Sequence, residues 1–315
     1  MTECPPRRWA PALDLARSSL RIGTRSGGPS NRFRNAVFLT IGANIAMSGI
    51  TALSGLLLAR MLGASDRGVV AALMTWLSVI TVVGECGMTH TVCYFVARRP
   101  GEAADYVRTA LRLMLVLGAA AALAGILLTP FIADDGHEWL FRASFLAEPL
   151  LFVGGVWMFA IQAVDLRAWN RARLVQPVVY TAGVLLLVVL DAATVTSAIA
   201  VMLLSIAIQT VLVRIQYRRR VAARGRARRQ LLGPMLRYGA SNLLTSSPSL
   251  VTLRLDQLVL AFIDSAQLGR YAVAVSLSGL VGPTVLAFGQ VAMPRIAAAD
   301  RRSPPPTRLV WPATS

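Results

Sequence analysis

Three ionisable side chains lie near the middle of long apolar stretches of this chain, and they are the groups best placed for chemistry: Glu85, Arg254 and Asp256. At the centre of a bilayer each would cost about 2.5 to 3.5 kcal/mol if it faced lipid. A guanidinium there suits a phosphate or a carboxylate, and a partly buried carboxylate suits a proton or a cation. Arg254 and Asp256 are two residues apart, so they point to different sides of a helix. An ion pair between helices, such as Arg254 with Glu85, is the purely structural alternative.

Small polar residues recur every three or four positions in two of the apolar stretches. Polar side chains on a membrane helix must face protein or water, so each series predicts an inward face. The two series together predict a central water-filled cleft, whereas the alternative is that small residues only let helices pack closely. The first series is Thr40, Asn44, Ser48, Thr51 and Gly55, and the second is Asn242, Thr245, Ser249, Thr252 and Asp256.

Long apolar segments must position these residues. Hydrophobic residues make up 55% of the chain and charged residues only 15%, whereas soluble domains average roughly 25% charged. A spanning helix needs roughly 20 mostly apolar residues. We therefore predict an all-α polytopic membrane protein with about eight transmembrane helices. They are expected near 36–61, 69–97, 106–133, 143–165, 174–190, 194–213, 236–263 and 270–296.

The formal net charge of +17 is concentrated in short segments beside these spans. Most arginines lie in the two ends of the chain and in every second segment that connects the apolar stretches. The positive-inside rule therefore predicts that both termini are cytoplasmic. The charge is thus explained by membrane topology, and we expect no nucleic-acid partner. The arginines between 218 and 229 are expected to lie on anionic lipid headgroups.

An internal repeat divides the chain. Residues 56–73 and 258–275 share a helix end, a short polar turn, a glycine and a small-residue helix start. Six spans separate the copies, which predicts parallel repeats in two lobes. We expect a disordered basic cytosolic tail (1–35), a six-helix lobe (36–213), a basic cytosolic linker (214–235), the first two helices of a second lobe (236–297) and a disordered or aberrant tail (298–315). Because only two spans follow the linker, we expect a truncated chain or a partner that supplies the missing half-lobe.

Two polar clusters invite other interpretations. Cys86, His90 and Cys93 share a helical face that could suit a metal, but membrane-buried cysteine usually packs as a small hydrophobe. Asp134, Asp135, His137 and Glu138 form the best cluster for catalysis, yet carboxylates there more simply keep a loop solvated. No nucleotide-binding glycine loop is present. We therefore expect neither an enzyme nor a bound metal or cofactor.

Six short motifs resemble those of polysaccharide biosynthesis proteins, the Wzx-type flippase branch of the multidrug/oligosaccharidyl-lipid/polysaccharide (MOP) exporter superfamily. The resemblance runs from about Asn35 to Ala299. The motifs are G-A-S-D-R-G (63–68), Y-F-V-A-R-R (94–99), W-N-R-A-R-L-V-Q-P (169–177), R-L-D-Q-L-V-L-A (254–261), G-R-Y-A-V-A-V-S (269–276) and M-P-R-I-A (293–297).

The resemblance implies a flippase of the bacterial cytoplasmic membrane that moves polyprenyl-diphosphate-linked oligosaccharide by alternating access of two lobes. It implies a lipid-linked glycan substrate and glycan polymerase or assembly proteins as partners. On this hypothesis Arg254 binds the diphosphate or a charged sugar. Asp256 and Glu85 form an ion site or gating pair, and Asn44, Ser48 and Asn242 bind the glycan. A small-molecule or multidrug exporter of the same fold, and a truncated membrane scaffold that does not transport, are the alternatives.

Overall fold

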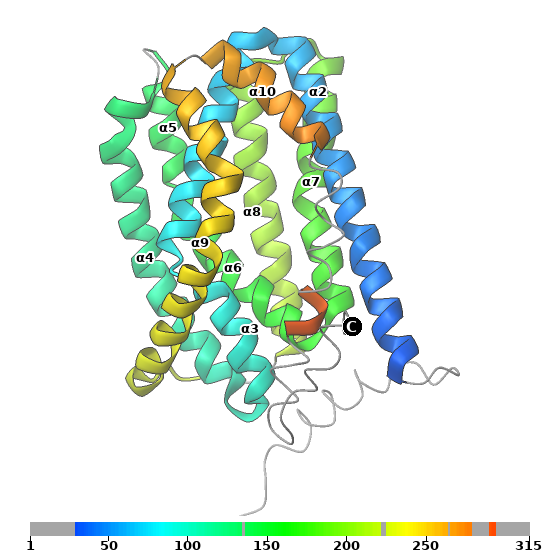
Figure 1. Cartoon of the computed structure of the whole chain (residues 1–315), viewed down its shortest axis with the longest axis vertical. Helices are drawn as coiled ribbons and strands as arrows, with labels where there is room; N and C mark the ends of the chain where they lie inside the picture. Colours follow the sequence, from blue (N-terminus) through cyan, green and yellow to red (C-terminus); the bar gives the residue numbers. More distant parts are fainter. Residues whose placement is uncertain (1–28, 134–135, 222–224, 264, 279–289, 294–315) are drawn as a thin grey trace, which may run out of the picture.

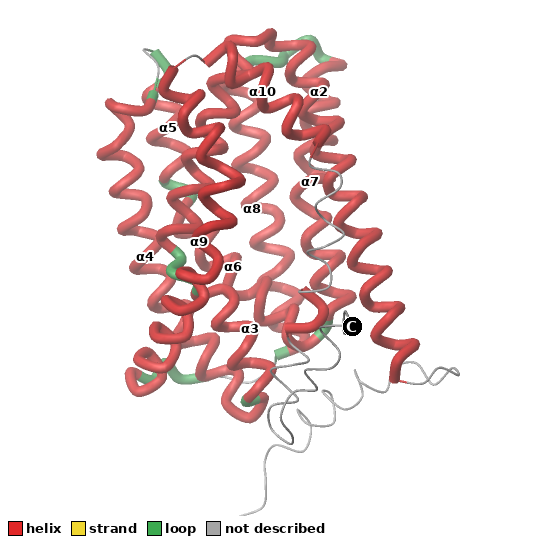
Figure 2. Tube along the Cα trace, in the orientation of Figure 1, coloured by secondary structure: helices red, strands yellow, loops and turns green. Residues whose placement is uncertain are grey.

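The computed structural model describes residues 29–133, 136–221, 225–263, 265–278 and 290–293, and it describes no side chains for 29–34, 36, 246–254, 262–263, 265 and 276–278. Within these ranges the regular structure is helical and contains no strand (Figure 2). The predicted tails at 1–28 and 298–315 lie outside the described residues. Residues 29–35, which we predicted to be part of the first tail, belong to a helix instead.

Helix α2 (Pro29–Gly84) contains the first predicted span and most of the second, with a kink between them at Gly63. Gly63 has a φ of 76° and a ψ of −176°, a conformation in which glycine alone is at ease. The expected polar turn is therefore a kink within a nearly continuous helix.

The second predicted span, 69–97, is not one helix. Helix α2 ends at Gly84, and α3 (Met88–Arg98) begins after a turn in which Cys86 and Gly87 have φ values of 49° and 67°. Left-handed residues cannot continue a right-handed helix, so the prediction of an unbroken span was wrong. The break leaves Glu85 at the end of a helix in the middle of the span.

The remaining helices of the first lobe are α4 (Ala103–Ile132), α5 (Glu138–Phe145), α6 (Glu148–Val164), α7 (Leu166–Val189) and α8 (Val195–Arg220), with a short 3₁₀ turn η1 (Pro100–Glu102) before α4. The predicted span 143–165 is broken, because α5 ends at Phe145 and α6 starts with Glu148 and Pro149. Proline suits a helix start, where its missing N–H is not needed.

Two predicted loops are helical. The Asp165 carboxylate accepts hydrogen bonds from the backbone N–H groups of Arg167 and Ala168, both at 3.0 Å, and so caps α7. Arg173, which we predicted to lie in the loop before this span, is therefore two turns inside the helix. Helix α8 likewise continues through Arg220, the seventh residue of the predicted linker.

After a short turn η2 (Arg229–Leu231), the chain forms α9 (Leu232–Ile263) and α10 (Ser265–Ser278). Helix α9 runs along the first lobe, and α10 lies across α2 at the upper end of the bundle in Figure 1. At that end the backbones touch, because a Cβ on Gly269 would lie 2.2 Å from the Ala64 carbonyl oxygen.

Five helical segments among the described residues are long and apolar enough to cross a membrane: Val37–Gly84, Pro100–Ile132, Glu138–Val164, Leu166–Val189 and Val195–Arg220. One side of α4 shows the lipid-facing surface that such a protein needs. Val116, Leu123, Leu127 and Phe131 repeat at helical spacing and are all more than half exposed. The prediction of a polytopic helical membrane protein is confirmed, while the expected number of eight spans stays a prediction.

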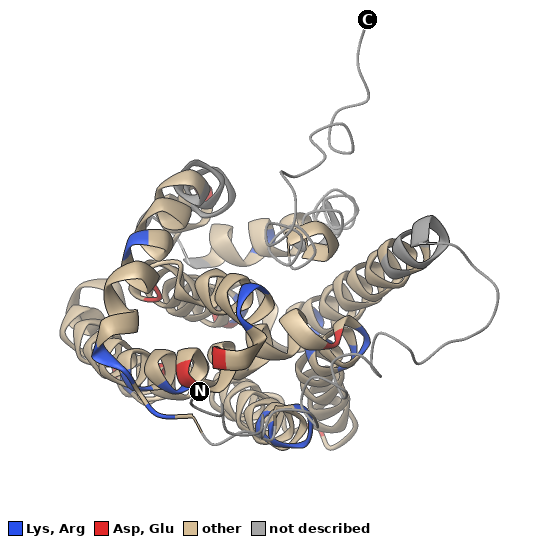
Figure 3. Ribbon diagram, turned by 90° about the horizontal axis from the view of Figure 1, so that it is seen from below, with Lys and Arg blue, Asp and Glu red and all other residues tan. Residues whose placement is uncertain are grey.

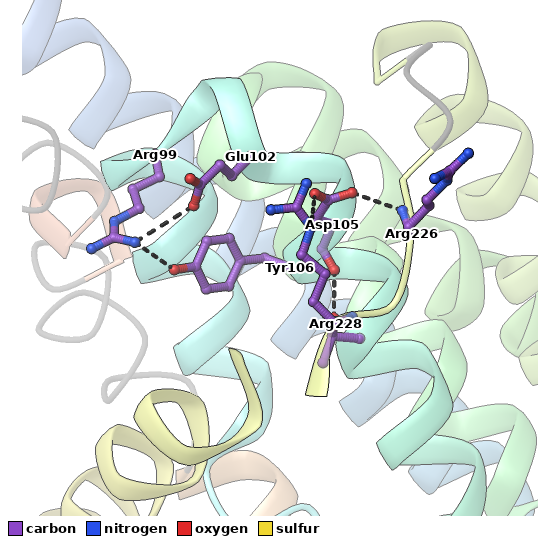
Figure 4. A network of polar contacts seen from close by, with 7 residues as sticks. Arg99, Glu102, Asp105, Tyr106, Arg226 and Arg228 are labelled. Carbon is purple, nitrogen blue, oxygen red and sulfur yellow. Dashed lines mark hydrogen bonds and ion pairs between the residues drawn. The ribbon is translucent and has the colours of Figure 1, made fainter. Parts of the chain in front are cut away.

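Basic and acidic groups join the linker to the opposite end of the bundle, where several helices carry arginines (Figure 3). The Asp105 carboxylate accepts from the backbone N–H of Arg226 at 2.7 Å and pairs with Arg228 Nε at 2.8 Å (Figure 4). Arg220 pairs with Asp165 at 3.1 Å at the same end. The linker is thus fastened to α4 through protein contacts, in addition to any lipid contact of the kind we predicted.

We expect Asp105→Ala to release the linker from α4. Both bonds to Asp105 are partly solvated, so stability should fall by only about 1 kcal/mol. Cleavage by an arginine-specific protease within 224–229 should accelerate several-fold in the folded protein. Glu102→Ala is the matched control, because Glu102 pairs with the exposed Arg99 at 3.5 Å and does not contact the linker. Equal cleavage of the two variants would show that Asp105 does not hold the linker.

Candidate functional site

A cavity of about 250 Å³ lies where the break between α2 and α3 meets α9. Its polar walls come from both predicted lobes, since Glu85 and Asn242 both face it. Two of the residues that we predicted for the site are therefore brought together at one place. The lining residues are Val82, Glu85, Gly87, Thr89, His90, Phe159, Asn242 and Leu243.

Glycines let α9 approach the break closely enough to form this cavity. A Cβ on Gly87 would lie 2.4 Å from the Gly239 carbonyl oxygen, and a Cβ on Gly239 would lie 2.6 Å from that of Cys86. The same two helices also stack aromatic rings, since the ring centroids of Tyr94 on α3 and Tyr238 on α9 are 4.4 Å apart. The two predicted lobes are thus in backbone contact beside the cavity.

Glu85 is held by its own half of the structure. Its Oε2 accepts a hydrogen bond from the Thr89 hydroxyl at 3.0 Å. Its Oε1 faces α6, where a Cβ on Gly155 would lie 3.5 Å away. His90 packs its ring edge-on against Phe159, with centroids 5.0 Å apart. The cavity therefore offers one carboxyl group beside an aromatic surface.

A second polar site, the Gln290 junction, joins α2, α6 and α7 to the helical residues 290–293. The Gln290 side-chain oxygen accepts from Asn44 and from Arg173, each at 3.3 Å. Its backbone carbonyl accepts from the Gln162 amide at 3.1 Å. Beside the junction, Asn170 donates to Thr40 at 3.0 Å. The junction consists of Asn44, Gln162, Arg173 and Gln290.

Arg173 provides the positive charge of the junction. Its guanidinium lies over the Trp169 ring at 4.3 Å, an arrangement that stabilises a cation and fixes its orientation. The side chain is half-buried, and no carboxylate among the described residues forms an ion pair with it. A desolvated cation that has neutral amides as neighbours can bind an anionic ligand.

The other predicted residues are dispersed. In the first series Thr40 and Asn44 are buried, Ser48 is half-buried and Thr51 is exposed. In the second series Thr245 is exposed and donates to the Ser241 carbonyl oxygen at 2.9 Å. Asp256 accepts from the Tyr271 hydroxyl of α10 and from its neighbour's backbone N–H at 2.7 Å. Ser249, Thr252 and Arg254 lie outside the described side chains, so the pairing of Arg254 with Glu85 stays a prediction.

Sequence reasoning missed Arg173, Gln162 and Gln290. Arg173 was assigned to a loop, although Asp165 is a residue type that commonly caps the start of a helix. The two glutamines stand alone in apolar segments, where a periodic search for small polar residues does not detect them. For the predicted metal alternative, the described residues contain no group of three or more possible ligands, and Cys93 is buried among apolar side chains.

A family model for polysaccharide biosynthesis proteins matches residues 57–302. No curated protein matches the chain.

Solved structures of transporters share the fold. One, titled as the outward-facing conformation of a multidrug resistance MATE family transporter of the MOP superfamily, has a TM-score of 0.64 at 12% identity and covers 85% of this chain. The MATE multidrug transporter DinF-BH has a TM-score of 0.69 at 15% identity, covering 88% of this chain and 67% of its own. A MOP superfamily transporter from Pyrococcus furiosus has a TM-score of 0.64 at 12% identity, covering 85% and 65% of the two chains.

These identities show the fold alone, which is that of MOP superfamily transporters. The chain spans 66% of the length of the first of these structures.

Proposed function

The chain belongs to the polysaccharide biosynthesis protein family, and from this premise we propose that it moves a polyprenyl-diphosphate-linked oligosaccharide across the cytoplasmic membrane by alternating access. The fold supports transport, since it is the fold of MOP transporters. No bond need be made or broken in the substrate. Binding, shielding from lipid and release are the tasks of the site.

The observation that carries the proposal is Arg173 at the Gln290 junction. A diphosphate needs a cation in a fixed orientation. A guanidinium held over Trp169, with no carboxylate paired to it among the described residues, provides one. Around it, the amides of Asn44 and Gln162 are donors and acceptors of the kind that bind sugar hydroxyls. Arg254, as predicted, would add a second cation from the other lobe.

The distribution of charges supports an orientation with the linker in the cytoplasm. Asp105, Asp165 and the arginines that contact them lie at one end of the bundle, together with the basic linker. The positive-inside rule assigns this end to the cytoplasm. The Gln290 junction lies on the cytoplasmic half of α7, only two turns from the helix start at Leu166. A diphosphate entering from the inner leaflet would reach Arg173 early.

Export of a cationic amphiphile is a second candidate, and the cavity favours it. Glu85 and Phe159 both line that space, and a carboxylate beside an aromatic ring suits an organic cation. The two candidates differ in the charge they require: the flippase depends on Arg173, and the drug exporter depends on Glu85.

We expect Arg173→Gln to lower the flipping rate at least tenfold, because a charge-assisted bond to phosphate is worth about 1.5 to 3 kcal/mol. The full chain is reconstituted in liposomes with polyprenyl diphosphate that carries a short fluorescent oligosaccharide. Flipping is read as loss of access to a membrane-impermeant quencher. Arg171→Gln is the matched control, since Arg171 is an exposed arginine on the same helix.

Each outcome separates the candidates. Loss of flipping in Arg173→Gln with normal flipping in Arg171→Gln supports the flippase. No flipping by the unaltered chain, together with uptake of a cationic dye that Glu85→Gln abolishes, would favour the exporter. Equal flipping by Arg173→Gln and the unaltered chain would refute the role of Arg173.

A further inference from the structure

Glu148, at the first turn of α6, is a carboxyl group buried inside the first lobe. None of its surface is exposed. Its Oε2 lies 2.9 Å from the Thr81 hydroxyl of α2, and its Oε1 is buried without a hydrogen-bond partner in the part of the chain that the structure describes. A wholly buried carboxylate needs a cation or several donors to remain ionised. Among the described residues, the side chain of Glu148 has one possible donor, the Thr81 hydroxyl.

The hydroxyl of Thr81 cannot satisfy two acceptors at once. It lies 2.7 Å from the Leu77 carbonyl oxygen as well as 2.9 Å from Glu148 Oε2, and a hydroxyl carries a single proton. The shorter contact takes that proton, since it is the usual bond from a threonine to the preceding helical turn. The contact with Glu148 is then a hydrogen bond only if Glu148 donates. If Glu148 is protonated, it carries no buried charge, and it supplies the proton for its hydrogen bond with Thr81.

The charged groups around Glu148 support the same conclusion. In the turn that follows α2 the ionisable neighbour is Glu85, which is also a carboxyl group. On α5 Arg142 is exposed and pairs with Glu138 at 2.6 Å, and on α8 Arg214 lies over Trp157. The arginines of α4 are Arg108 and Arg112, in the helix half beside the linker. None of these cations forms an ion pair with Glu148, and the start of α6 offers only the partial positive charge of a helix end.

Glu85 connects this buried group to the cavity. Glu85 follows Thr81 by one helical turn, since its backbone N–H donates to the Thr81 carbonyl oxygen at 2.9 Å. Its Oε1 faces Gly155, and residues 148 and 155 are seven apart on α6 and therefore share a face. Both carboxyl groups thus lie between α2 and α6. Glu85 lines the cavity, whereas Glu148 is wholly enclosed.

We propose that Glu85 and Glu148 form a proton-binding pair, in which Glu85 exchanges protons with the cavity and Glu148 stores one inside the first lobe. Glu148 starts as a carboxylic acid and Glu85 as a carboxylate. Glu85 takes a second proton from water in the cavity and later returns it there. While Glu85 is a carboxylate, the Glu148 proton can pass to it and back, so that only one of the two groups is ionised at a time. Because like charges in one buried place cannot both be ionised, the pair retains at least one proton.

This proposal rests on the proposed function for its purpose, since a proton bound on one side and released on the other can drive flipping. Arg173 and the Gln290 junction hold the substrate, and the carboxyl pair, Glu85 in the turn after α2 and Glu148 on α6, supplies the coupling. The helix break at Cys86 and Gly87 adjoins Glu85, so movement of α9 against α3 changes the access of Glu85 to water.

The test is infrared spectroscopy of the full chain in liposomes without substrate, which detects the C=O stretch of a protonated carboxylic acid. We expect the unaltered chain to show this band at neutral pH and Glu148→Gln to lose it. Glutamine has the shape of protonated glutamate and can still donate to Thr81, so this variant should fold. In Glu85→Gln the band should remain. The proton of the Glu148 carboxylic acid should exchange with deuterium at least tenfold more slowly, because its route to the cavity through Glu85 is removed. Glu138→Gln, at an exposed ion pair, is the control.

An unchanged band in Glu148→Gln would overturn the proposal. Loss of the band on adding sodium at constant pH would also overturn it, in favour of a cation site. Because no glycan is present, these results stand even if the chain flips no lipid-linked glycan. Conversely, normal flipping with no carboxylic acid band would leave the proposed function intact and exclude the proton pair.

Discussion

Gly87→Ala is expected to lower the free energy of unfolding by about 2 to 5 kcal/mol, a large effect for the addition of one methyl group. The backbone contributes first, because Gly87 has a φ of 67°. An L-residue in the left-handed region costs about 1 to 2 kcal/mol. Steric overlap contributes the remainder, because the new Cβ would lie 2.4 Å from the Gly239 carbonyl oxygen.

The overlap is with backbone, so no side-chain rotation relieves it. Either α9 moves away from α3 or the turn at the break changes shape, and overpacking of this kind costs about 1 to 3 kcal/mol. Separation of the helices would also unstack Tyr94 from Tyr238. The cavity beside Glu85 would then lose the wall formed by α9.

Thermal unfolding of the purified protein, followed by light scattering or intrinsic fluorescence, measures the effect. Gly42→Ala is the matched control. Gly42 is a helical glycine of α2 with open space around its Cβ position, so alanine there should stabilise by about 0.5 to 1 kcal/mol. If the two variants unfold at the same temperature, the close contact at the break does not stabilise the fold.

Hydropathy and arginine placement were sufficient to predict the fold class and the approximate positions of most helices. They were insufficient for the interruptions, because an apolar segment has the same composition whether its helix is continuous or broken. Gly84 and Gly87 were sequence signals for the break in the second span, but glycines are common in membrane helices. The lobe boundaries stay predictions.

Glu85 and Asn242 were singled out because an ionisable or amide group stood alone among apolar residues, and both line the cavity, while their roles stay predictions. The placement of charged residues near a predicted helix end was less accurate. Arg67 was assigned to an outside loop, yet it is only 7% exposed because α2 continues through the Gly63 kink. Arg173 was displaced from the loop by the Asp165 cap, and Glu148, inside the predicted span 143–165, was not singled out.

The contact between α2 and α10 closes the end of the bundle opposite the linker. Gly269 makes that contact possible, because a Cβ there would lie 2.2 Å from the Ala64 carbonyl oxygen and 3.0 Å from the Gly68 nitrogen. These residues belong to the two copies of the predicted repeat. Alternating access requires this end to close and open in turn, so a side chain inserted here should act on the equilibrium between the two states.

We expect Gly269→Ala to hold this end apart and to lower the flipping rate at least tenfold, which corresponds to about 1.4 kcal/mol against the closed state. Spin labels at the exposed positions Arg60 and Arg270, introduced as Arg60→Cys and Arg270→Cys with the native cysteines replaced, would report a longer distance in this variant. Gly233→Ala on α9 is the control, since nothing lies within 4 Å of its Cβ position. A normal rate together with an unchanged distance would mean that α10 does not need this contact to close. A normal rate with a longer distance would mean that the end closes without limiting transport.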